Sequence, residues 1–215
     1  MMRGWLRSDG RKGIRNVVAV AYLVECAHHV AREVAGADRE TAHIIGFPGC
    51  FPNPYAQKMM ERLCTHPNVG AVLLVSLGCE SFNRHQVESV VKATGRPVKV
   101  LVIQNTGGTR SSIAEGRAWV AAQVAALATA RTVPMEVSKW IVGTVCGGSD
   151  GTSGITGNPA AGIAFNKLVA AGAACIFEET GELIGCEAIM EARAATPALA
   201  LELRASVEKA ARYYE

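Results

Sequence analysis

Short apolar runs rich in β-branched residues alternate with longer amphipathic stretches along most of the chain. A short apolar run is typical of a buried strand, and apolar positions that recur every three or four residues are typical of a helix with one buried face. The pattern predicts strands at residues 16–24, 42–47, 69–77, 98–103, 140–145 and 173–177. It predicts helices at residues 26–35, 54–65, 84–93, 111–130, 157–171, 185–194 and 197–214.

Side chains define parts of two predicted helices. In the second predicted helix, Tyr55, Met59 and Leu63 share one apolar face. In the fourth, Ser111 or Ser112 is available to cap the amino terminus. The first set defines the expected apolar face of the second helix. The serines define the expected start of the fourth helix.

The alternation of strands and helices predicts a Rossmann-like three-layer α/β sandwich, in which helices cover both faces of a mostly parallel sheet. The chain has 215 residues, which suits one large domain or two small ones. We predict a single α/β domain over residues 1–215, with possible halves at 1–133 and 134–215 and a connection around Pro134. Ligands of such sheets bind beyond the carboxyl ends of the strands, so we expect the chemistry in the loops after the strands.

Composition and charge exclude several classes of protein. Hydrophobic residues make up 49% and charged residues 19%, which excludes a disordered or fibrous chain. The net charge of +3 is small and scattered, so we expect no nucleic-acid partner. No apolar run is long enough to cross a bilayer, and residues 1–10 lack the apolar core of a secretory signal, so we expect no membrane partner. The seven cysteines are an odd number, which favours reduced thiols in a cytoplasmic protein over a disulfide framework.

Four loops after predicted strands combine glycine with cysteine or polar residues, at residues 49–54, 78–81, 104–110 and 146–154. Glycine allows positive φ angles and a close approach of the backbone to a ligand. Free amides in such turns, and at the helix that follows, bind anions. Basic residues also gather near the amino terminus, at Arg3, Arg7, Arg11, Lys12 and Arg15. We therefore expect a small anionic molecule as the substrate.

Three cysteines, Cys50, Cys79 and Cys146, come just after predicted strands and beside glycine. If the fold is as predicted, their thiolates could converge at one edge and hold iron or zinc with a fourth position open to a substrate oxygen. The spacing is not the compact Cys-x-x-Cys pattern, and the other interpretation is that they are small residues at tight strand ends. The remaining cysteines lie within helix or strand patterns and are predicted to be core or structural residues: Cys26, Cys64, Cys175 and Cys186.

Two segments are candidates for binding a carboxylate or phosphate. Residues 104–110 form a glycine turn that ends at Arg110, which could pair with a carboxylate or simply lie exposed at a helix start. Residues 7–16 form a basic loop with two glycines, which could fold over an anionic ligand or remain a solvated arm. The chain lacks the Gly-x-x-x-x-Gly-Lys and Gly-x-Gly-x-x-Gly orders, so a nucleotide-binding loop and a nicotinamide-binding domain are not supported.

Few residues are obvious candidates for general acid–base work. Each histidine is more often structural than catalytic, and His28 or His29 is the strongest candidate base because they follow the first predicted strand. Residues 178–182 follow the last predicted strand and contain three glutamates, which could act as a base or metal ligands or lie in a solvated turn. A transferase with Cys146 as nucleophile is a weaker alternative, because no histidine is clearly placed to activate the thiol.

Together these segments resemble the altronate/galactarate dehydratase family, which includes sulfolactate sulfo-lyase. The Cys-Gly-Gly-Ser-Asp-Gly run is the most specific part of the resemblance, which covers nearly the whole chain in the family's order. The matching stretches are residues 9–16, 66–68, 77–80, 104–110 and 146–159.

The resemblance implies a lyase that removes water, or sulfite, next to the carboxylate of a sugar acid or related 2-hydroxy acid. It implies iron, as Fe²⁺ or an iron–sulfur centre, or another divalent metal, and the candidate ligands are Cys50, Cys79 and Cys146. The candidate catalytic residues are Glu80, Asp150 and Ser149, and either Glu80 or Asp150 would be the base or orient it. The candidate substrate-binding residues are Arg15, Asn16, Thr106, Gly107, Gly108, Thr109, Arg110, Gly147 and Gly148.

The chain departs from the family pattern in three ways. Asn105 stands where the family has aspartate, and Cys50 lies in Gly-Cys-Phe-Pro-Asn where Gly-Cys-Gly is common. Family enzymes also continue past Glu215 and carry a small amino-terminal domain or a separate small subunit. We therefore expect a small partner subunit or a further carboxyl-terminal domain, with a homo-oligomer as another possible assembly. The alternative function is a non-catalytic domain that binds an anion or sugar acid, or that serves in assembly.

Overall fold

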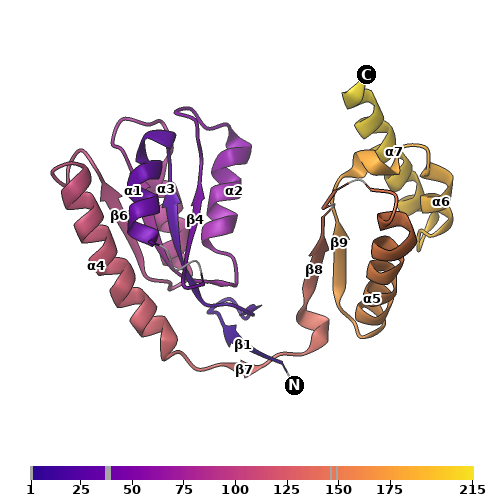
Figure 1. The fold of residues 1–215 in the computed structure, drawn as a ribbon, viewed down its shortest axis with the longest axis horizontal. Helices are drawn as coiled ribbons and strands as arrows, with labels where there is room; N and C mark the ends of the chain where they lie inside the picture. The colour runs from indigo at the N-terminus through magenta and orange to yellow at the C-terminus, as the bar shows by residue number, and fades with distance from the viewer. Residues whose placement is uncertain (1, 37–39, 146, 149) are drawn as a thin grey trace. The chain divides into compact units, whose positions relative to one another are not determined.

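A computed structural model describes residues 2–36, 40–145, 147, 148 and 150–215. The chain divides into two compact units, Met1–Met135 and Glu136–Glu215, which we call the first and the second unit (Figure 1). The Rossmann-like prediction is confirmed, because the first unit contains a parallel sheet flanked by helices.

The sheet of the first unit has the strand order β4-β3-β5-β6, and all three pairings are parallel. The register places Val20 of β3 opposite Ile44 of β4 on one side and Leu73 of β5 on the other. Every residue of β5 is buried, as expected for a central strand covered on both faces. The strands are β3 (Val17–Tyr22), β4 (Ala42–Gly46), β5 (Val69–Ser76) and β6 (Val98–Val102).

Two layers of helices cover the sheet, with α1 and α4 on one face and α2 and α3 on the other (Figure 1). Successive strand residues point to opposite faces, so Leu73 packs with the α1–α4 layer and Leu74 with the α2–α3 layer. The helices are α1 (His28–Ala35), preceded by the 3₁₀ turn η1 (Glu25–Ala27), then α2 (Pro54–Cys64), α3 (Arg84–Ala93) and α4 (Thr109–Ala128).

Two helix details differ from the prediction. Met60 and Cys64 form the buried face of α2, whereas Tyr55 is 70% exposed, so the face predicted from Tyr55, Met59 and Leu63 is wrong. Helix α4 begins at Thr109, and its amino-terminal cap is Gly108, which makes no side-chain cap. The serines predicted as caps lie inside the helix, where Ser112 is buried.

A small antiparallel sheet of the first unit was not predicted. It has the order β2-β1-β7, with β1 (Arg3–Leu6), β2 (Lys12–Gly13) and β7 (Val133–Pro134). The segment around Pro134, predicted to be a connection, pairs with Arg3 and Gly4 of β1. These strands are short and carry charged residues, so they lack the apolar runs on which the prediction depended.

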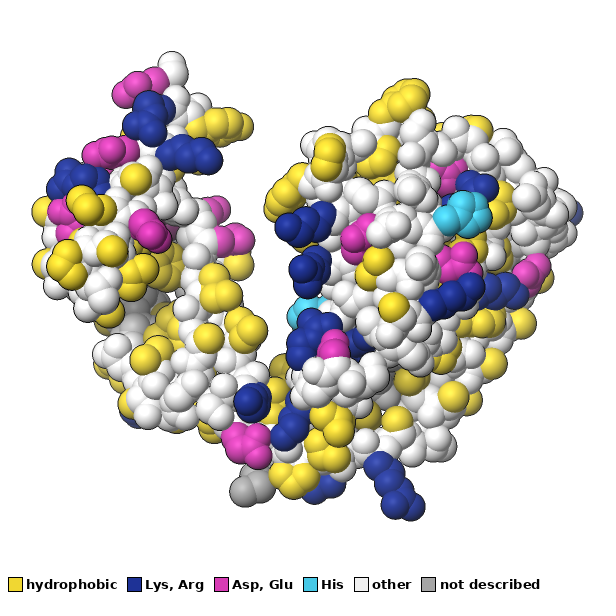
Figure 2. Space-filling model, turned by 180° about the vertical axis from the view of Figure 1, so that it is seen from behind, with side chains coloured by type: hydrophobic (Ala, Val, Ile, Leu, Met, Phe, Trp, Pro, Cys, Tyr) yellow, Lys and Arg dark blue, Asp and Glu magenta, His cyan; other side chains and the backbone are white. Residues whose placement is uncertain are grey.

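The second unit is built around two parallel strands, β8 (Ile141–Thr144) and β9 (Ala174–Phe177). Among its described residues, Ala173 and Val207 are the buried hydrophobic ones, and many large apolar side chains are exposed (Figure 2). Its other elements are η2 (Val137–Lys139), the π-helical turn η3 (Ser153–Gly157), α5 (Asn158–Ala170), η4 (Thr180–Leu183), α6 (Glu187–Ala192) and α7 (Pro197–Tyr214).

In the described part of the chain, no helix combines the length and apolar character needed to cross a membrane.

Candidate active site

Three loops meet at the carboxyl edge of the four-stranded sheet. The backbone amide of Ser81, after β5, donates a hydrogen bond to the carbonyl of Cys50, after β4, at 3.0 Å. The amide of Gln104, after β6, donates to the carbonyl of Leu77 at 3.2 Å. The loops after β4, β5 and β6 are therefore tied together by their backbones, at the edge where ligands of such sheets bind.

Gly78 allows the loops after β5 and β6 to approach each other. Its φ angle is +128°, which disfavours any residue with a side chain. A Cβ atom at this position would lie 2.6 Å from Oε1 of Gln104, so a larger residue would also displace that side chain. Glycine at this position therefore leaves room for the Gln104 side chain directly before Cys79.

Two predicted metal ligands, Cys50 and Cys79, are exposed in these joined loops. Cys26, predicted to be a core or structural residue, is exposed as well, just after β3, so it does not lie in the core. Cys64 is buried as predicted, and burial raises the pKa of its thiol to about 12. Exposed thiols thus follow three neighbouring strands, β4, β3 and β5.

The described residues supply two of the three predicted ligands, because Cys146 lies outside them. Among residues that the structure does describe, no three His, Cys, Asp or Glu side chains are grouped closely enough to hold a metal ion. Thiolate donors suit iron or zinc, so the chemistry of Cys50 and Cys79 fits the expected metal class. A metal at this edge remains a prediction.

Glu80 is 9% exposed, and its carboxylate turns back to the residues that precede Cys79. Its Oε1 accepts a short hydrogen bond from the hydroxyl of Ser76, and its Oε2 accepts one from the amide of Gly78 at 2.8 Å. Burial alone would raise the pKa of Glu80, but these hydrogen bonds and the charge of Arg84 outweigh it and lower the pKa. An ionised carboxylate whose oxygens accept these bonds holds the loop in place. The roles of Ser76 and Arg84 were not predicted, because they depend on how the folded chain brings these two residues close to Glu80.

The glycine turn after β6 leads directly into the amino terminus of α4. Gly107 and Gly108 have φ angles of +90° and +91°, and Gly108 is followed directly by α4. Thr106 donates from its hydroxyl to the Val102 carbonyl at 2.8 Å, so its side chain stabilises the turn. Thr109 and Arg110 are exposed in the first turn of α4, where free amides and the helix dipole favour an anion.

Arg15 and Asn16 lie before β3, at the amino edge of the sheet. The Arg15 amide donates to Oδ1 of Asn68 at 3.2 Å, and Nδ2 of Asn16 donates to the Leu127 carbonyl at 3.0 Å. Parallel strands point the same way, so this edge is opposite the one that carries residues 104–110. The structure does not bring Arg15 and Asn16 together with the glycine turn.

Other basic residues of the amino-terminal segment hold the small antiparallel sheet against the main one. Arg7 Nε donates to the Pro67 carbonyl at 2.6 Å, and Arg11 Nη2 donates to the Thr65 carbonyl at 2.8 Å. Arg96, which is buried, donates to the same Thr65 carbonyl at 3.2 Å. Burial, and then the charge of Arg96, lower the pKa of Arg7 to about 10. These contacts tie the segment to the rest of the first unit, so it is not a solvated arm.

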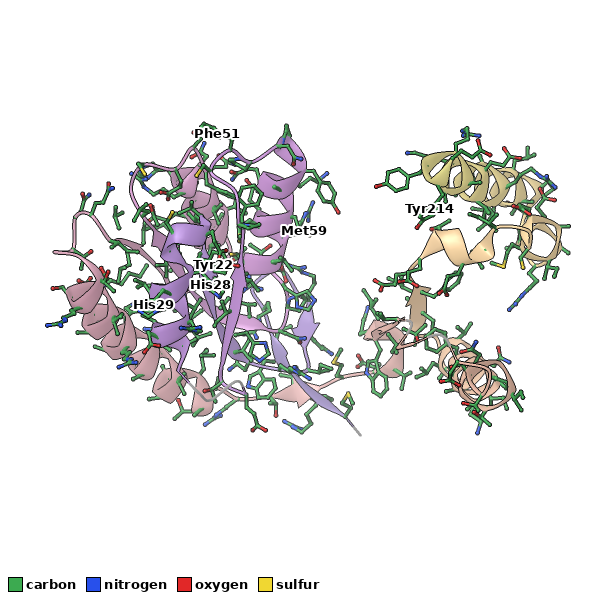
Figure 3. All side chains as sticks on the ribbon, turned by 45° about the horizontal axis from the view of Figure 1, so that its top comes forward. Tyr22, His28, His29, Phe51, Met59 and Tyr214 are labelled. Carbon is green, nitrogen blue, oxygen red and sulfur yellow. The ribbon has the colours of Figure 1, made fainter. Side chains whose placement is uncertain are left out.

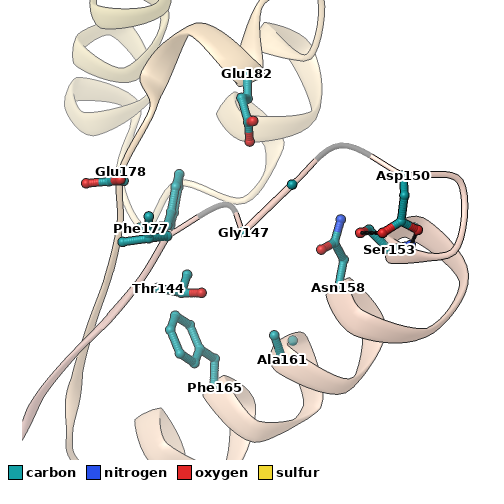
Figure 4. A pocket seen from close by; sticks show the side chains of 14 residues that line it. Thr144, Gly147, Asp150, Ser153, Asn158, Ala161, Phe165, Phe177, Glu178 and Glu182 are labelled. Carbon is teal, nitrogen blue, oxygen red and sulfur yellow. Dashed lines mark hydrogen bonds between the residues drawn. The ribbon is translucent and has the colours of Figure 1, made fainter.

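The second unit contains a pocket of about 520 Å³ between its strands and α5 (Figure 4). The predicted glycines Gly147 and Gly148 line it, and Glu178 and Glu182 line it from the segment after β9. The other lining residues are Thr144, Val145, Asp150, Ser153, Gly154, Asn158, Ala161, Gly162, Phe165 and Phe177. The pocket therefore joins two segments that the sequence singled out separately.

Asp150 lines this pocket, and its carboxylate shapes the turn into η3. Its Oδ1 accepts hydrogen bonds from the Thr152 hydroxyl, from the Thr152 amide at 2.7 Å and from the Ser153 amide at 3.1 Å. These bonds, led by that of the Thr152 hydroxyl, lower the pKa of Asp150. Ser149, the third predicted catalytic residue, lies outside the described residues.

The candidate residues are thus divided between the two units, and sequence comparison divides the chain in the same way. The sequence model described as "D-galactarate dehydratase/Altronate hydrolase, second domain" matches residues 4–128. A second, described as "D-galactarate/Altronate dehydratase, C-terminal", matches residues 137–215. The chain belongs to the D-galactarate dehydratase/altronate hydrolase family.

Individual relatives agree with membership of the D-galactarate dehydratase/altronate hydrolase family. The chain is 32% identical over 203 residues to (2R)-sulfolactate sulfo-lyase subunit beta of Chromohalobacter salexigens, covering 89% of this chain and 50% of that protein. It is 28% identical over 208 residues to altronate dehydratase of Bacillus subtilis, covering 90% and 41%. It is 28% identical over 202 residues to altronate dehydratase of Escherichia coli, covering 86% and 40%. The chain therefore spans half or less of the length of these family members.

Proposed function

We propose that this chain contributes to a lyase site that removes water from a sugar acid or a related 2-hydroxy acid. The observation that carries the proposal is the joining of three loops at the carboxyl edge of the sheet, in a chain of this family. These loops place exposed thiols, the glycine turn and the hydrogen-bonded carboxylate of Glu80 at one edge of the sheet. That combination suits a substrate with a carboxylate next to the carbon that reacts.

The anionic end of the substrate would bind at the glycine turn. The amide of Gly107, with those of the first turn of α4, would hold a carboxylate, and Arg110 is exposed beside them. In the second unit, a separate pocket lined by Gly147 and Gly148 would bind a polar group through backbone amides.

Cys50 and Cys79 are the described residues that would hold iron or another divalent metal, and the third predicted ligand, Cys146, lies outside the described residues. Such an ion, when bound, would supply a Lewis acid that stabilises negative charge on a substrate oxygen. Within the chain itself, Glu80 would keep Cys79 in position through its bonds to Ser76 and Gly78. Asp150 would do the same for the turn that follows Ser149.

The leaving group would be water or sulfite. Relatives are named altronate dehydratase and (2R)-sulfolactate sulfo-lyase, so both eliminations occur in the family. Anaerobically purified protein, with and without added Fe²⁺, should be incubated with altronate, galactarate and (2R)-sulfolactate. Dehydration should yield a 2-keto acid, and sulfo-lyase activity should release sulfite. No product from any of the three, with the complete protein, would refute the lyase proposal.

Metal binding has its own test. We expect Cys79→Ser to lower the iron content and the activity of the protein, and Cys26→Ser, an equally exposed cysteine after the neighbouring strand, to lower neither. Elemental analysis of anaerobically purified variants measures the iron. Equal metal content in wild type and Cys79→Ser would show that Cys79 is not a ligand.

The second candidate is a sugar-acid-binding or assembly role without turnover by this chain. The exposed apolar side chains of the second unit favour it, because they suit a surface covered by further polypeptide. One relative is named a subunit beta, and we propose a partner subunit for this chain as well. Thermal stabilisation by a sugar acid without any product would support this role.

A further inference from the structure

Three side chains at the end of β3 form a compact cluster that the proposed site has not used. Strand β3 ends at Tyr22, the η1 turn contains Glu25, and α1 begins at His28. Nδ1 of His28 lies 3.0 Å from Oε1 of Glu25. The rings of His28 and Tyr22 stack with their centroids 4.7 Å apart and their planes 19° from parallel (Figure 3). The imidazole is thus held at one nitrogen and on one face.

The neighbouring strand makes room for this arrangement. A Cβ atom at Gly46 of β4 would lie 2.1 Å from the ring of Tyr22, so any larger residue there would push the ring away. The Phe47 amide donates to the Tyr22 carbonyl at 3.0 Å, which fixes the backbone at the same level. Burial, and then the charge of Glu25, raise the pKa of Tyr22, so the ring remains a neutral surface for the imidazole.

The cluster lies at the edge where the candidate loops meet. Strand β3 is flanked by β4 and β5, and the bond between Cys50 and Ser81 joins the loops on its two sides. His28 is therefore at the middle of the carboxyl edge. Its side chain is 40% exposed, so a ligand can reach the ring. Because Nδ1 is taken up by Glu25, Nε2 is the nitrogen left to exchange a proton with that ligand.

The carboxylates predicted as bases are less suited to that task. Both oxygens of Glu80 accept hydrogen bonds from Ser76 and Gly78, and Asp150 accepts several from its own turn. Imidazole is the side chain that most often takes and returns a proton near neutral pH, and a carboxylate at its other nitrogen orients it for that role.

We propose that His28 is the acid–base residue of this site and that Glu25 is a positioning residue that holds its ring. The inference rests on the proposed lyase function. Nε2 takes the proton from the carbon next to the substrate carboxylate, and the C–H electron pair forms the C=C bond. The C–O bond breaks, and the hydroxyl leaves with its electron pair. The proton on His28 passes to that hydroxyl, which gives water and restores the neutral ring.

The test compares two histidines in the complete protein, with any partner subunit that its turnover requires. We expect His28→Gln to lower kcat by about 10²- to 10⁴-fold with little change in KM. His85→Gln, at an exposed histidine whose Nδ1 lies 4.0 Å from Oε2 of Glu88, should leave kcat unchanged. Glu25→Gln should lower kcat by about tenfold and alter the pH profile, and Glu25→Asp should recover part of the loss. Circular dichroism would check that each variant is folded.

A second measurement does not depend on turnover. Nitrogen-15 NMR of labelled histidine should show His28 with its proton on Nδ1, and Glu25→Gln should abolish that preference. Turnover by wild type with equal kcat in His28→Gln would overturn the role of His28 and leave the lyase function standing. A His28 ring protonated at Nε2 would also overturn it. Absence of turnover in the complete wild-type protein would overturn the lyase function and this inference together.

Discussion

Glu80 shows how one buried carboxylate can control a reactive loop. It lies directly after Cys79, yet its oxygens turn back to Ser76 at the end of β5 and to the amide of Gly78. A charged acceptor strengthens each of these hydrogen bonds relative to a neutral one. The loop geometry before and after Cys79 therefore depends on the charge of Glu80.

We expect Glu80→Gln to lower the free energy of unfolding by about 1–3 kcal/mol at pH 7, because buried donors lose a charged acceptor. The pKa of Glu80 is lower in the folded protein than its ordinary value. The stabilisation is therefore fully present above the ordinary glutamate pKa of about 4.3 and is lost as the pH falls through the folded value. Urea unfolding between pH 7 and pH 3 should show the two proteins converging in stability.

Glu115→Gln is the matched control for this prediction. Glu115 pairs with Lys99 at 2.8 Å on the surface, where its side chain is 45% exposed. Removing such a pair should change stability by less than about 1 kcal/mol. A Glu80→Gln variant that behaves like this control at every pH would contradict the proposed role of Glu80.

At the scale of elements, the packing of α4 on α1 depends on a glycine within a helix. Gly116 is buried in α4, and a Cβ atom there would lie 2.6 Å from Cγ2 and 3.1 Å from Cγ1 of Val34 in α1. Glycine is a poor helix former, so its presence is explained by this close approach of two helices. The approach keeps both helices on one face of the sheet.

Gly116→Ala should destabilise the first unit by about 1–3 kcal/mol, because overpacking outweighs the gain in helix propensity. Gly162→Ala in α5 should have the opposite sign and stabilise its helix by up to about 1 kcal/mol, since a Cβ atom there meets nothing within 4 Å. Hydrogen exchange of the amides in α4 and α5 measures each effect locally. Stabilisation by both substitutions would show that propensity alone decides both effects.

At the scale of the whole molecule, the two units differ in how much apolar surface they bury. The first unit has a hydrophobic cluster on each face of its sheet. The described part of the second unit buries few hydrophobic residues and exposes side chains such as Ile155 at 79% and Leu201 at 69%. Burial of apolar surface is the main favourable term in folding, so the units should differ in independent stability.

We expect a fragment of residues 1–135 to unfold cooperatively in urea, because its core is complete. A fragment of residues 136–215 should unfold without a sharp transition and should bind a dye that reports exposed apolar surface. Circular dichroism and dye fluorescence measure the two properties. A cooperative transition and no dye binding for residues 136–215 would contradict the idea that this unit is covered by further polypeptide.

The elements of the first unit could be predicted because each carries its own signal. The run from Val69 to Ser76 is apolar throughout, and the structure places β5 there. Helix α3 has the predicted bounds. The short strands β1, β2 and β7 could not be predicted, since β1 and β2 form a local hairpin without an apolar run and β7 pairs with β1 from far along the chain. The apolar face of α2 was wrong by one position, because packing on the sheet selected Met60 and Cys64.

The sequence by itself determined the alternating α/β order and the loops that carry glycine and cysteine, because periodicity and glycine are local properties of the chain. Only the tertiary structure decided which of these residues meet. It joined Cys50 to Ser81 and Leu77 to Gln104, and placed Arg15 at the opposite edge. It also placed His28 between Tyr22 and Glu25. Such contacts depend on strand order and helix placement, and a single sequence contains no local signal for either.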